Sequence, residues 1–373
     1  MIGKKLLVLH PSLAPYRVDF FNSLNENYDA EFYFFNTNLL NQEFDQEKLK
    51  KDINFTANYL TRGFNLLGRS FRIGIGKIID KEQPDIVICT EYNLINIVLI
   101  LYRFLSRRKF KIYSICDDNI SVAKNVSFFK NLSRAIQLRT LDGIILTHTD
   151  IAEWYKLKLN PRAKLLIFPI IRKENLFRQK LETSIPLAEG LKDKYKLKEK
   201  KLLLFVGRLT AVKNLELLVE AFDMVYKKRQ DAVLIIVGSG PMKDQINEKI
   251  TKYGLQQAII LPGRFEGESL LAWYLLSQIF ILPSTNELFG AVVNEALLAG
   301  CYVLVSNLAG GASLIKEGWN GETFNPSDIN EMAFIILYTL NRDELFNYQV
   351  ELKESRVLFP YQNAFNSVMR ELA

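Results

Sequence analysis

Short apolar runs alternate with amphipathic segments along the whole of this 373-residue chain. An apolar run of about four to eight residues is typical of a strand buried on both faces, and each gap between runs is long enough for a helix. Strands that alternate with helices in this way form parallel sheets covered by helices, so the pattern predicts an α/β protein. Strands are expected at residues 5–9, 30–35, 86–89, 111–115, 143–147, 165–168, 201–206, 233–237, 259–261, 279–282, 302–306 and 322–324.

The length of the chain predicts two domains, because a single core rarely organises more than about 300 residues. A polar, lysine-rich stretch separates the two halves of the strand pattern. Two Rossmann-like domains are therefore expected to face each other across a cleft, with ligands beyond the carboxyl ends of their strands. The expected parts are a first domain over 1–178, a linker over 179–198, a second domain over 199–355 and a helix at about 356–373 that packs back on the first domain.

Composition and targeting signals narrow the class further. The chain is about half hydrophobic and a quarter charged, which is typical of a globular protein. Its three cysteines, Cys89, Cys116 and Cys301, are too far apart for a disulfide framework or a zinc site, which favours a reducing compartment. The first apolar run is too short for a signal peptide, and the longest one, 94–102, is well short of the roughly 20 residues of a membrane span. A cytoplasmic protein is expected.

Positive charge is concentrated in the first half of the chain. Residues 1–180 contain 28 Lys and Arg against 18 Asp and Glu, whereas residues 181–373 contain 20 against 23. The excess is either a solvated surface or a means of loose contact with anionic lipid at the inner face of a membrane. Nucleic-acid binding is not expected, because the chain has no recognised module for it. The most basic cluster is Arg103, Arg107, Arg108, Lys109 and Lys111.

Two acids flank a strand-to-helix turn in the second half. Glu287 follows the apolar run 279–282, and Glu295 lies one turn into a helix that Gly300 ends. Ionised carboxylates offer only hydrogen-bond acceptors, so the pair suits a polyhydroxylated ligand. Gly290, between them, would let a backbone N–H approach phosphate or sugar. The start of the helix also favours an anionic group.

Two cations follow the first strand of the second half. Gly207 permits close approach of the backbone, Arg208 offers a planar fork for phosphate oxygens, and Lys213 adds a point charge. Together these groups could neutralise a diphosphate, although two surface cations in an ordinary turn would look the same in the sequence.

Two further turns end the next strands. Gly238 begins the sequence Gly-Ser-Gly-Pro, which is neither a Walker loop nor a dinucleotide fingerprint and by itself favours a structural turn. The turn Gly263-Arg264-Phe265 could place backbone groups on a base, or could be a plain loop.

Taken in order, these motifs resemble the carboxy-terminal domain of the retaining glycosyltransferases of family four, which have the GT-B fold. The resemblance covers about residues 201–324 and is weaker in the first half, where Pro15-Tyr16-Arg17-Val18 contributes to it. It implies a UDP- or GDP-sugar donor held mainly by the second domain, an acceptor held by the first, and no metal or other cofactor. It also implies the donor-binding residues: Gly207, Arg208, Lys213, Gly238, Gly263, Arg264, Phe265, Glu287, Leu288, Phe289, Gly290 and Glu295.

The resemblance assigns roles to four of these side chains. Arg208 and Lys213 would bind the diphosphate, Glu295 the ribose hydroxyls and Glu287 the transferred sugar. Glu287 could act as a nucleophile, since retaining chemistry allows one. The preferred alternative is that the leaving diphosphate, stabilised by the two cations, helps to deprotonate the acceptor on the same face.

The chain departs from its relatives in the first domain. Many relatives carry a histidine after a strand there, facing the donor sugar, but this chain has Cys116-Asp117-Asp118 in the corresponding stretch. Asp117 is therefore the candidate catalytic group of the first domain. His10, Tyr16, Arg17 and His148 are the candidates on the acceptor side, with the two histidines as alternatives to Asp117.

The leading interpretation is a retaining hexosyltransferase that acts on a glycan or a polyprenyl-diphosphate-linked oligosaccharide. Its expected role is in the synthesis of capsule, exopolysaccharide or O-antigen. A sugar-nucleotide epimerase or phosphorylase of the same fold is one alternative. A non-catalytic protein that binds a sugar nucleotide is another.

Overall fold

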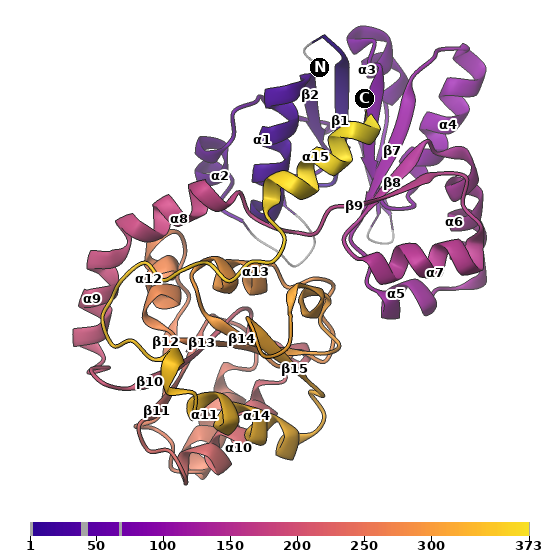
Figure 1. Ribbon diagram of the computed structural model, residues 1–373. Helices are drawn as coiled ribbons and strands as arrows, with labels where there is room; N and C mark the ends of the chain where they lie inside the picture. The colour runs from indigo at the N-terminus through magenta and orange to yellow at the C-terminus, as the bar shows by residue number, and fades with distance from the viewer. Residues whose placement is uncertain (1–2, 39–43, 67–68, 373) are drawn as a thin grey trace. The chain divides into compact units, whose positions relative to one another are not determined.

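The computed structural model describes residues 3–38, 44–66 and 69–372, and their contacts divide the chain into two compact units (Figure 1). Unit 1 comprises Met1–Ile170 with Gln362–Ala373, and unit 2 comprises Ile171–Tyr361. Each unit has its own parallel sheet, so the expected α/β fold class is confirmed.

Unit 1 is built on a sheet whose strand order is β3-β2-β1-β6-β7-β8-β9, with every pairing parallel. β1 is buried over nearly its whole length, as expected for an apolar strand covered on both faces. The strands are β1 (Lys5–His10), β2 (Asp29–Phe34), β3 (Ala57–Tyr59), β6 (Ile86–Thr90), β7 (Lys111–Cys116), β8 (Gly143–Leu146) and β9 (Lys164–Ile167).

Several helices of unit 1 begin at a short polar side chain that caps them. Asn93, Asn119 and Ser127 each accept a hydrogen bond from a backbone N–H in the first turn of the helix that follows. The helices are η1 (Pro15–Arg17), α1 (Val18–Asn27), α2 (Gln46–Asp52), α3 (Ile75–Glu82), α4 (Leu94–Ser106), α5 (Ile120–Lys124), α6 (Phe128–Thr140), α7 (Thr149–Leu159) and α15 (Tyr361–Leu372).

Three strands of unit 1 were not expected from the sequence. β3 joins the edge of the sheet, but its sequence Ala-Asn-Tyr is not an apolar run and its residues are only partly buried. The antiparallel hairpin of β4 (Gly63–Leu66) and β5 (Arg69–Arg72) interrupts the alternation of strands and helices. Both features depend on pairing with a neighbouring strand, and a periodicity argument does not detect pairing.

Unit 2 has a parallel sheet with the strand order β12-β11-β10-β13-β14-β15. Strand order reverses at β10, between β11 and β13, and this switch point is where open α/β sheets bind ligands. The strands are β10 (Lys201–Val206), β11 (Ala232–Val237), β12 (Ile259–Gly263), β13 (Ile279–Leu282), β14 (Tyr302–Ser306) and β15 (Gly321–Phe324).

The helices of unit 2 lie before its first strand, between its strands and after its last strand. They are α8 (Glu174–Thr183), α9 (Ile185–Lys194), η2 (Ala211–Lys213), α10 (Leu215–Tyr226), α11 (Lys243–Lys252), α12 (Glu268–Leu276), α13 (Ala291–Leu298), η3 (Gly310–Leu314), α14 (Ile329–Leu340) and η4 (Asp343–Leu345). None of the helices within the described ranges combines the length and the apolar character needed to cross a membrane.

The segment 179–198 is not the linker that its composition indicated. It forms parts of α8 and α9, which pack on α12 of unit 2 and bury Leu181 and Ala188 there. The rings of Tyr195 and Trp273 lie 5.3 Å apart in the same contact. The composition resembles that of a linker because lysines such as Lys180 and Lys194 occupy the solvent side of these amphipathic helices.

The last helix, α15, packs on unit 1 (yellow in Figure 1). The Tyr113 hydroxyl donates a hydrogen bond to the Glu371 carbonyl at 2.9 Å, and Lys164 forms an ion pair with the Glu371 carboxylate at 2.6 Å. Phe365 contributes an edge contact to the rings of Phe20 and Phe168. The end of the chain therefore completes the core of the unit in which the chain begins.

Candidate donor and acceptor sites

Backbone hydrogen bonds join the loops that leave β10, β11 and β12. The Gly207 N–H donates to the Val237 carbonyl at 3.0 Å, and the Gly238 N–H donates to the Gly263 carbonyl at 2.9 Å. A Cβ on Gly238 would lie 1.8 Å from the Gly207 carbonyl oxygen. The glycine is therefore required by the close approach of two strand ends, in addition to its positive φ of 155°.

Lys213 and Glu287 form an ion pair in unit 2. Lys213 ends the short helix η2, while Glu287 follows β13, which is the neighbour of β10 in the sheet. The side chains are 15% and 19% exposed, so the pair is shielded but still reachable from solvent. The sequence placed both residues in the site without predicting that they touch. Their contact brings the expected diphosphate and sugar positions together.

The turn between Glu287 and α13 is built around Gly290. This residue has φ +84°, and a Cβ there would lie 2.9 Å from Leu282 Cδ2 and 3.2 Å from Glu287 Cγ. The Gly310 N–H donates to the Glu287 carbonyl at 3.1 Å, which ties the turn to the loop after β14. Phe289 is buried and Leu288 is half exposed, so the two neighbours of Gly290 in the motif face different surroundings.

Glu295 is held by two residues that the motifs did not reveal. The Tyr274 hydroxyl donates to Glu295 Oε2 at 3.1 Å, and Arg172 Nη1 lies 3.8 Å from Glu295 Oε1. Burial, reinforced by Glu295, raises the pKa of Tyr274 well above its usual value, so the hydroxyl remains a donor. The Arg172 N–H also donates to Asn294 Oδ1 at 2.9 Å. The sequence motifs did not indicate either residue. Tyr274, for example, looks in the sequence like an ordinary core position of α12.

Three other residues expected on the donor side are Arg264 and Phe265, in the loop after β12, and Arg208, after β10. Arg264 is exposed and forms an ion pair with Glu266. The Phe265 ring packs edge-on against Trp273 at 5.7 Å, so the aromatic ring is partly committed to the core of unit 2. Arg208 leaves β10 directly after Gly207, at the switch point of the sheet.

A second group of expected residues comes together in unit 1. Arg17 is buried and forms an ion pair with Asp117, which is 22% exposed and lies 100 positions away in the sequence. The guanidinium of Arg17 also lies 5.7 Å from the centre of the Tyr16 ring. Burial, and then the nearby Asp117, raise the pKa of Tyr16 to about 12. We refer to His10, Tyr16, Arg17 and Asp117 as the Arg17 group.

His10 belongs to this group as a neutral residue. Its Nδ1 lies 2.8 Å from the Ser12 carbonyl, and its ring packs edge-on against Phe21 at 5.2 Å. Burial, followed by the charge of Arg17, lowers the pKa of His10 to about 4. Imidazole is therefore the form present at neutral pH.

His148 and Asp118 take other positions. His148 is buried after β8, and β6 and β7 separate that strand from β1, which carries His10. Asp118 pairs with the buried Arg134 at 3.2 Å, whose guanidinium lies 5.1 Å from the Tyr92 ring. The two successive aspartates therefore serve different buried arginines.

No group of three or more His, Cys, Asp or Glu side chains that could hold a metal ion is found in the described part of the chain. The three cysteines are free and buried. The charged groups placed at the site of unit 2 are Arg208, the Lys213–Glu287 pair and Glu295 with Arg172.

Comparison with known proteins shows what this arrangement resembles. Residues 189–355 match the family described as Glycosyl transferases group 1. An uncharacterized glycosyltransferase of Methanocaldococcus jannaschii is 34% identical over 136 residues, which is 36% of this chain and 35% of that protein. The alpha-monoglucosyldiacylglycerol synthase of Streptococcus pneumoniae is 27% identical over 188 residues, 48% of this chain and 40% of that protein. The chain thus matches less than half the length of these curated relatives.

Solved structures show the same fold over nearly the whole chain. The Anabaena protein HepE, solved in complex with UDP and glucose, matches with a TM-score of 0.70 and 16% identity over 99% of this chain and 97% of that one. The fold is therefore GT-B, with two Rossmann-like domains in one polypeptide. The match of residues 189–355 to the glycosyl transferases group 1 family bears out the resemblance predicted from the motifs.

Proposed function

We propose that this protein is a retaining glycosyltransferase that takes a sugar from a UDP- or GDP-sugar. The observation that carries the proposal is the shielded Lys213–Glu287 pair at the switch point of unit 2, beside the loop that begins with Gly207 and Arg208. A cation and an acceptor carboxylate held together suit the junction of a diphosphate with a hydroxylated sugar. The glycosyltransferase of Methanocaldococcus jannaschii supports the class of enzyme, and the UDP in the HepE structure supports the choice of donor.

In the proposed reaction the bond between the anomeric carbon and the diphosphate oxygen breaks, and the acceptor oxygen bonds to that carbon on the same face. The acceptor proton passes to the departing diphosphate. Arg208 and Lys213 stabilise the charge that develops on the diphosphate, which is the kind of term that usually dominates such catalysis. These two cations take the place of a metal ion in the proposal, so no cofactor is assigned.

The two acids have separate roles on the donor. Glu295, fixed by Tyr274 and Arg172, accepts hydrogen bonds from the ribose hydroxyls. Glu287 accepts hydrogen bonds from the transferred sugar, and its pairing with Lys213 favours this role over that of a nucleophile. The backbone of Phe289 and Gly290 lies in the same turn and is assigned to the sugar or phosphate.

Unit 1 supplies the acceptor side in the proposal. Asp117, held by Arg17, contributes the polar contact that a histidine provides in many relatives. His10 and Tyr16 belong to the same Arg17 group and are assigned to the acceptor side. His148 is a separate acceptor-side candidate. The proposed acceptor is a glycan or a polyprenyl-diphosphate-linked oligosaccharide at the cytoplasmic face of a membrane, in the synthesis of a cell-surface polysaccharide. The positive charge of unit 1 suits an acceptor that carries a diphosphate.

Calorimetric titration with UDP, GDP and their sugars tests the donor half of the proposal. We expect one nucleotide family to bind, and Glu287→Gln to weaken the binding of its nucleotide sugar more than that of the bare nucleotide. Glu248→Gln, on the exposed face of α11, is the matched control and should change neither. Absence of binding to every donor would refute the proposal.

Nucleotide release tests the reaction and separates the alternatives. A transferase releases free nucleotide from the donor when an acceptor is added, and the anomeric configuration of the product shows retention. Release of nucleotide only in the presence of an acceptor would count against an epimerase and a phosphorylase, whereas conversion of the nucleotide sugar to its epimer with no net release of nucleotide would favour an epimerase. Tight donor binding with no turnover for any acceptor would favour a non-catalytic binding protein.

A further inference from the structure

Helices α4 and α6 of unit 1 each expose a stripe of apolar side chains. On α4 the exposed residues Leu94, Val98, Leu101 and Leu105 follow one another at spacings of four, three and four, so they lie on one side of the helix. The opposite side packs into the core through Ile95 and Leu99. An amphipathic helix normally directs its apolar stripe inward, whereas α4 is apolar on both sides.

The second helix repeats the pattern. Phe128, Leu132 and Ile136 lie four residues apart on α6 and are exposed, while Leu138 is buried. We call these seven residues, together with Phe104 of α4, the α4/α6 face: Leu94, Val98, Leu101, Phe104, Leu105, Phe128, Leu132 and Ile136. Scattered exposed apolar residues are normal, but a group spread along two neighbouring helices marks an interaction surface.

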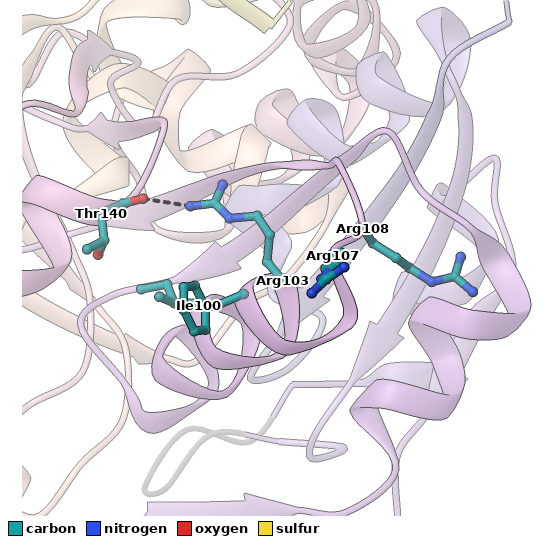
Figure 2. A pocket seen from close by; sticks show the side chains of 6 residues that line it. Ile100, Arg103, Arg107, Arg108 and Thr140 are labelled. Carbon is teal, nitrogen blue, oxygen red and sulfur yellow. Dashed lines mark hydrogen bonds between the residues drawn. The ribbon is translucent and has the colours of Figure 1, made fainter.

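The two helices are fastened together at their carboxyl ends. Arg103 Nη2 donates to the Thr140 carbonyl at 2.8 Å (Figure 2). Arg103 Nη1 also pairs with Asp142 at 2.6 Å. An open depression of about 450 Å³ lies at this junction. Its lining combines apolar and cationic side chains, namely Ile100, Arg103, Phe104, Arg107, Arg108 and Thr140.

The charge around this face is mainly positive. Neither α4 nor α6 contains an aspartate or a glutamate. Exposed cations fringe the apolar residues: Arg107 and Lys109 follow α4, and Lys130 and Arg139 lie on α6. Arg108 pairs with Asp80 at 2.9 Å, so an acid does approach the rim from α3. By sequence, unit 1 has 25 Lys and Arg against 18 Asp and Glu, whereas unit 2 has 23 of each.

We propose that the α4/α6 face docks on a lipid bilayer that contains anionic phospholipids. Phe104 and Leu105, which are 79% and 76% exposed, enter the boundary between headgroups and acyl chains, and the surrounding cations contact the phosphates. A protein partner fits less well, because lysine is depleted at protein interfaces and Lys109 and Lys130 border this apolar surface. The proposal deepens the proposed function, since it assigns a surface to the membrane contact of a lipid-linked acceptor.

Vesicle flotation without any nucleotide sugar tests the docking separately from the reaction. The probe is phosphatidylcholine vesicles with and without phosphatidylglycerol. We expect the protein to float with the anionic vesicles, and Phe104→Ser with Leu105→Ser to lower the bound fraction roughly tenfold. Phe334→Ser on α14, which is 67% exposed in unit 2, is the matched control and should float like the wild type.

Charge is tested by Arg107→Glu with Lys109→Glu, which should abolish the preference for anionic vesicles. Lys198→Glu with Lys252→Glu in unit 2 makes the same change in net charge and should retain it. Circular dichroism and nucleotide calorimetry on each variant show that folding and the site of unit 2 are intact. Equal flotation of all variants, or no flotation of the wild type, would overturn the proposal. A dimer that Phe104→Ser dissociates would assign the face to a second copy of the chain.

Discussion

The two units share one architecture but use their strand ends differently. In unit 2 the loops after β10, β11, β12 and β13 are closed by glycines and short backbone hydrogen bonds, and they present Lys213, Glu287 and Glu295 only partly covered. In unit 1 the corresponding groups are buried more deeply, with Arg17 and Arg134 inside the fold. A site for a diphosphate needs charges that a ligand can reach, whereas the Arg17 group presents mainly Asp117. The proposed function assigns the donor to unit 2 and the acceptor to unit 1, and this difference in the exposure of the charged groups supports that assignment.

The largest expected effect tests the assignment of the donor to unit 2. Arg208→Ala and Lys213→Ala should each lower kcat roughly 10²- to 10³-fold, because each removes a group that stabilises the leaving diphosphate. Nucleotide release measured on the donor found by calorimetry checks this. Lys252→Ala, an exposed cation on α11, should leave the rate unchanged. A loss of less than about threefold for both site variants would place the leaving-group charge elsewhere.

The next effect tests why the loops of unit 2 approach so closely. Gly238→Ala should destabilise unit 2 by about 3 kcal/mol, because its Cβ would overlap the Gly207 carbonyl and its φ is positive. Gly190→Ala on α9 meets nothing within 4 Å and should be neutral or stabilising by up to about 1 kcal/mol. Urea unfolding followed by tryptophan fluorescence compares the two variants, and similar midpoints would contradict the close approach.

A smaller effect belongs to unit 1 and depends on pH. The pKa of His10 in the folded protein is about 4, below its usual 6.5, so the unfolded chain binds the proton more tightly. The stabilisation is complete above about pH 7 and is lost as pH falls from there toward 4. The loss amounts to about 2 kcal/mol at pH 5. Urea unfolding of unit 1 at these pH values checks it. His10→Gln should remove this part of the pH dependence, and an unchanged slope would show that His10 is accessible in the folded state.

The smallest effect sharpens the role of Glu295. Tyr274→Phe removes the hydroxyl that holds this carboxylate and should weaken nucleotide binding about five- to tenfold, equivalent to a hydrogen bond worth about 1 kcal/mol. Calorimetry with the nucleotide measures it. Binding of a 2′,3′-dideoxy nucleotide should not differ between the variant and the wild type, because the ribose hydroxyls are absent. If both nucleotides weaken equally, Tyr274 acts through packing of α12.

Local pattern was sufficient for most of the fold. Apolar runs buried on both faces placed the strands of both sheets within a residue or two, since those residues must leave water wherever they pair. The lysine-rich segment 179–198 and the edge strand β3 were misjudged or missed, because their structure depends on what packs beside them. Glycine motifs at strand ends also identified the family, since the backbone geometry they permit is local.

The sequence by itself thus determined the fold class, the resemblance to the glycosyl transferases group 1 family and a set of candidate residues at the strand ends of unit 2. Only the tertiary structure decided which of them touch. The Lys213–Glu287 pair, the support of Glu295 by Tyr274, and the pairing of Arg17 with Asp117 across 100 positions all join residues that are distant in sequence. The exposure of the α4/α6 face was also decided there, because an apolar helix reads the same in sequence whether its second side is covered or open. Contacts and exposure follow from the packing of whole elements, and no spacing within one element records them.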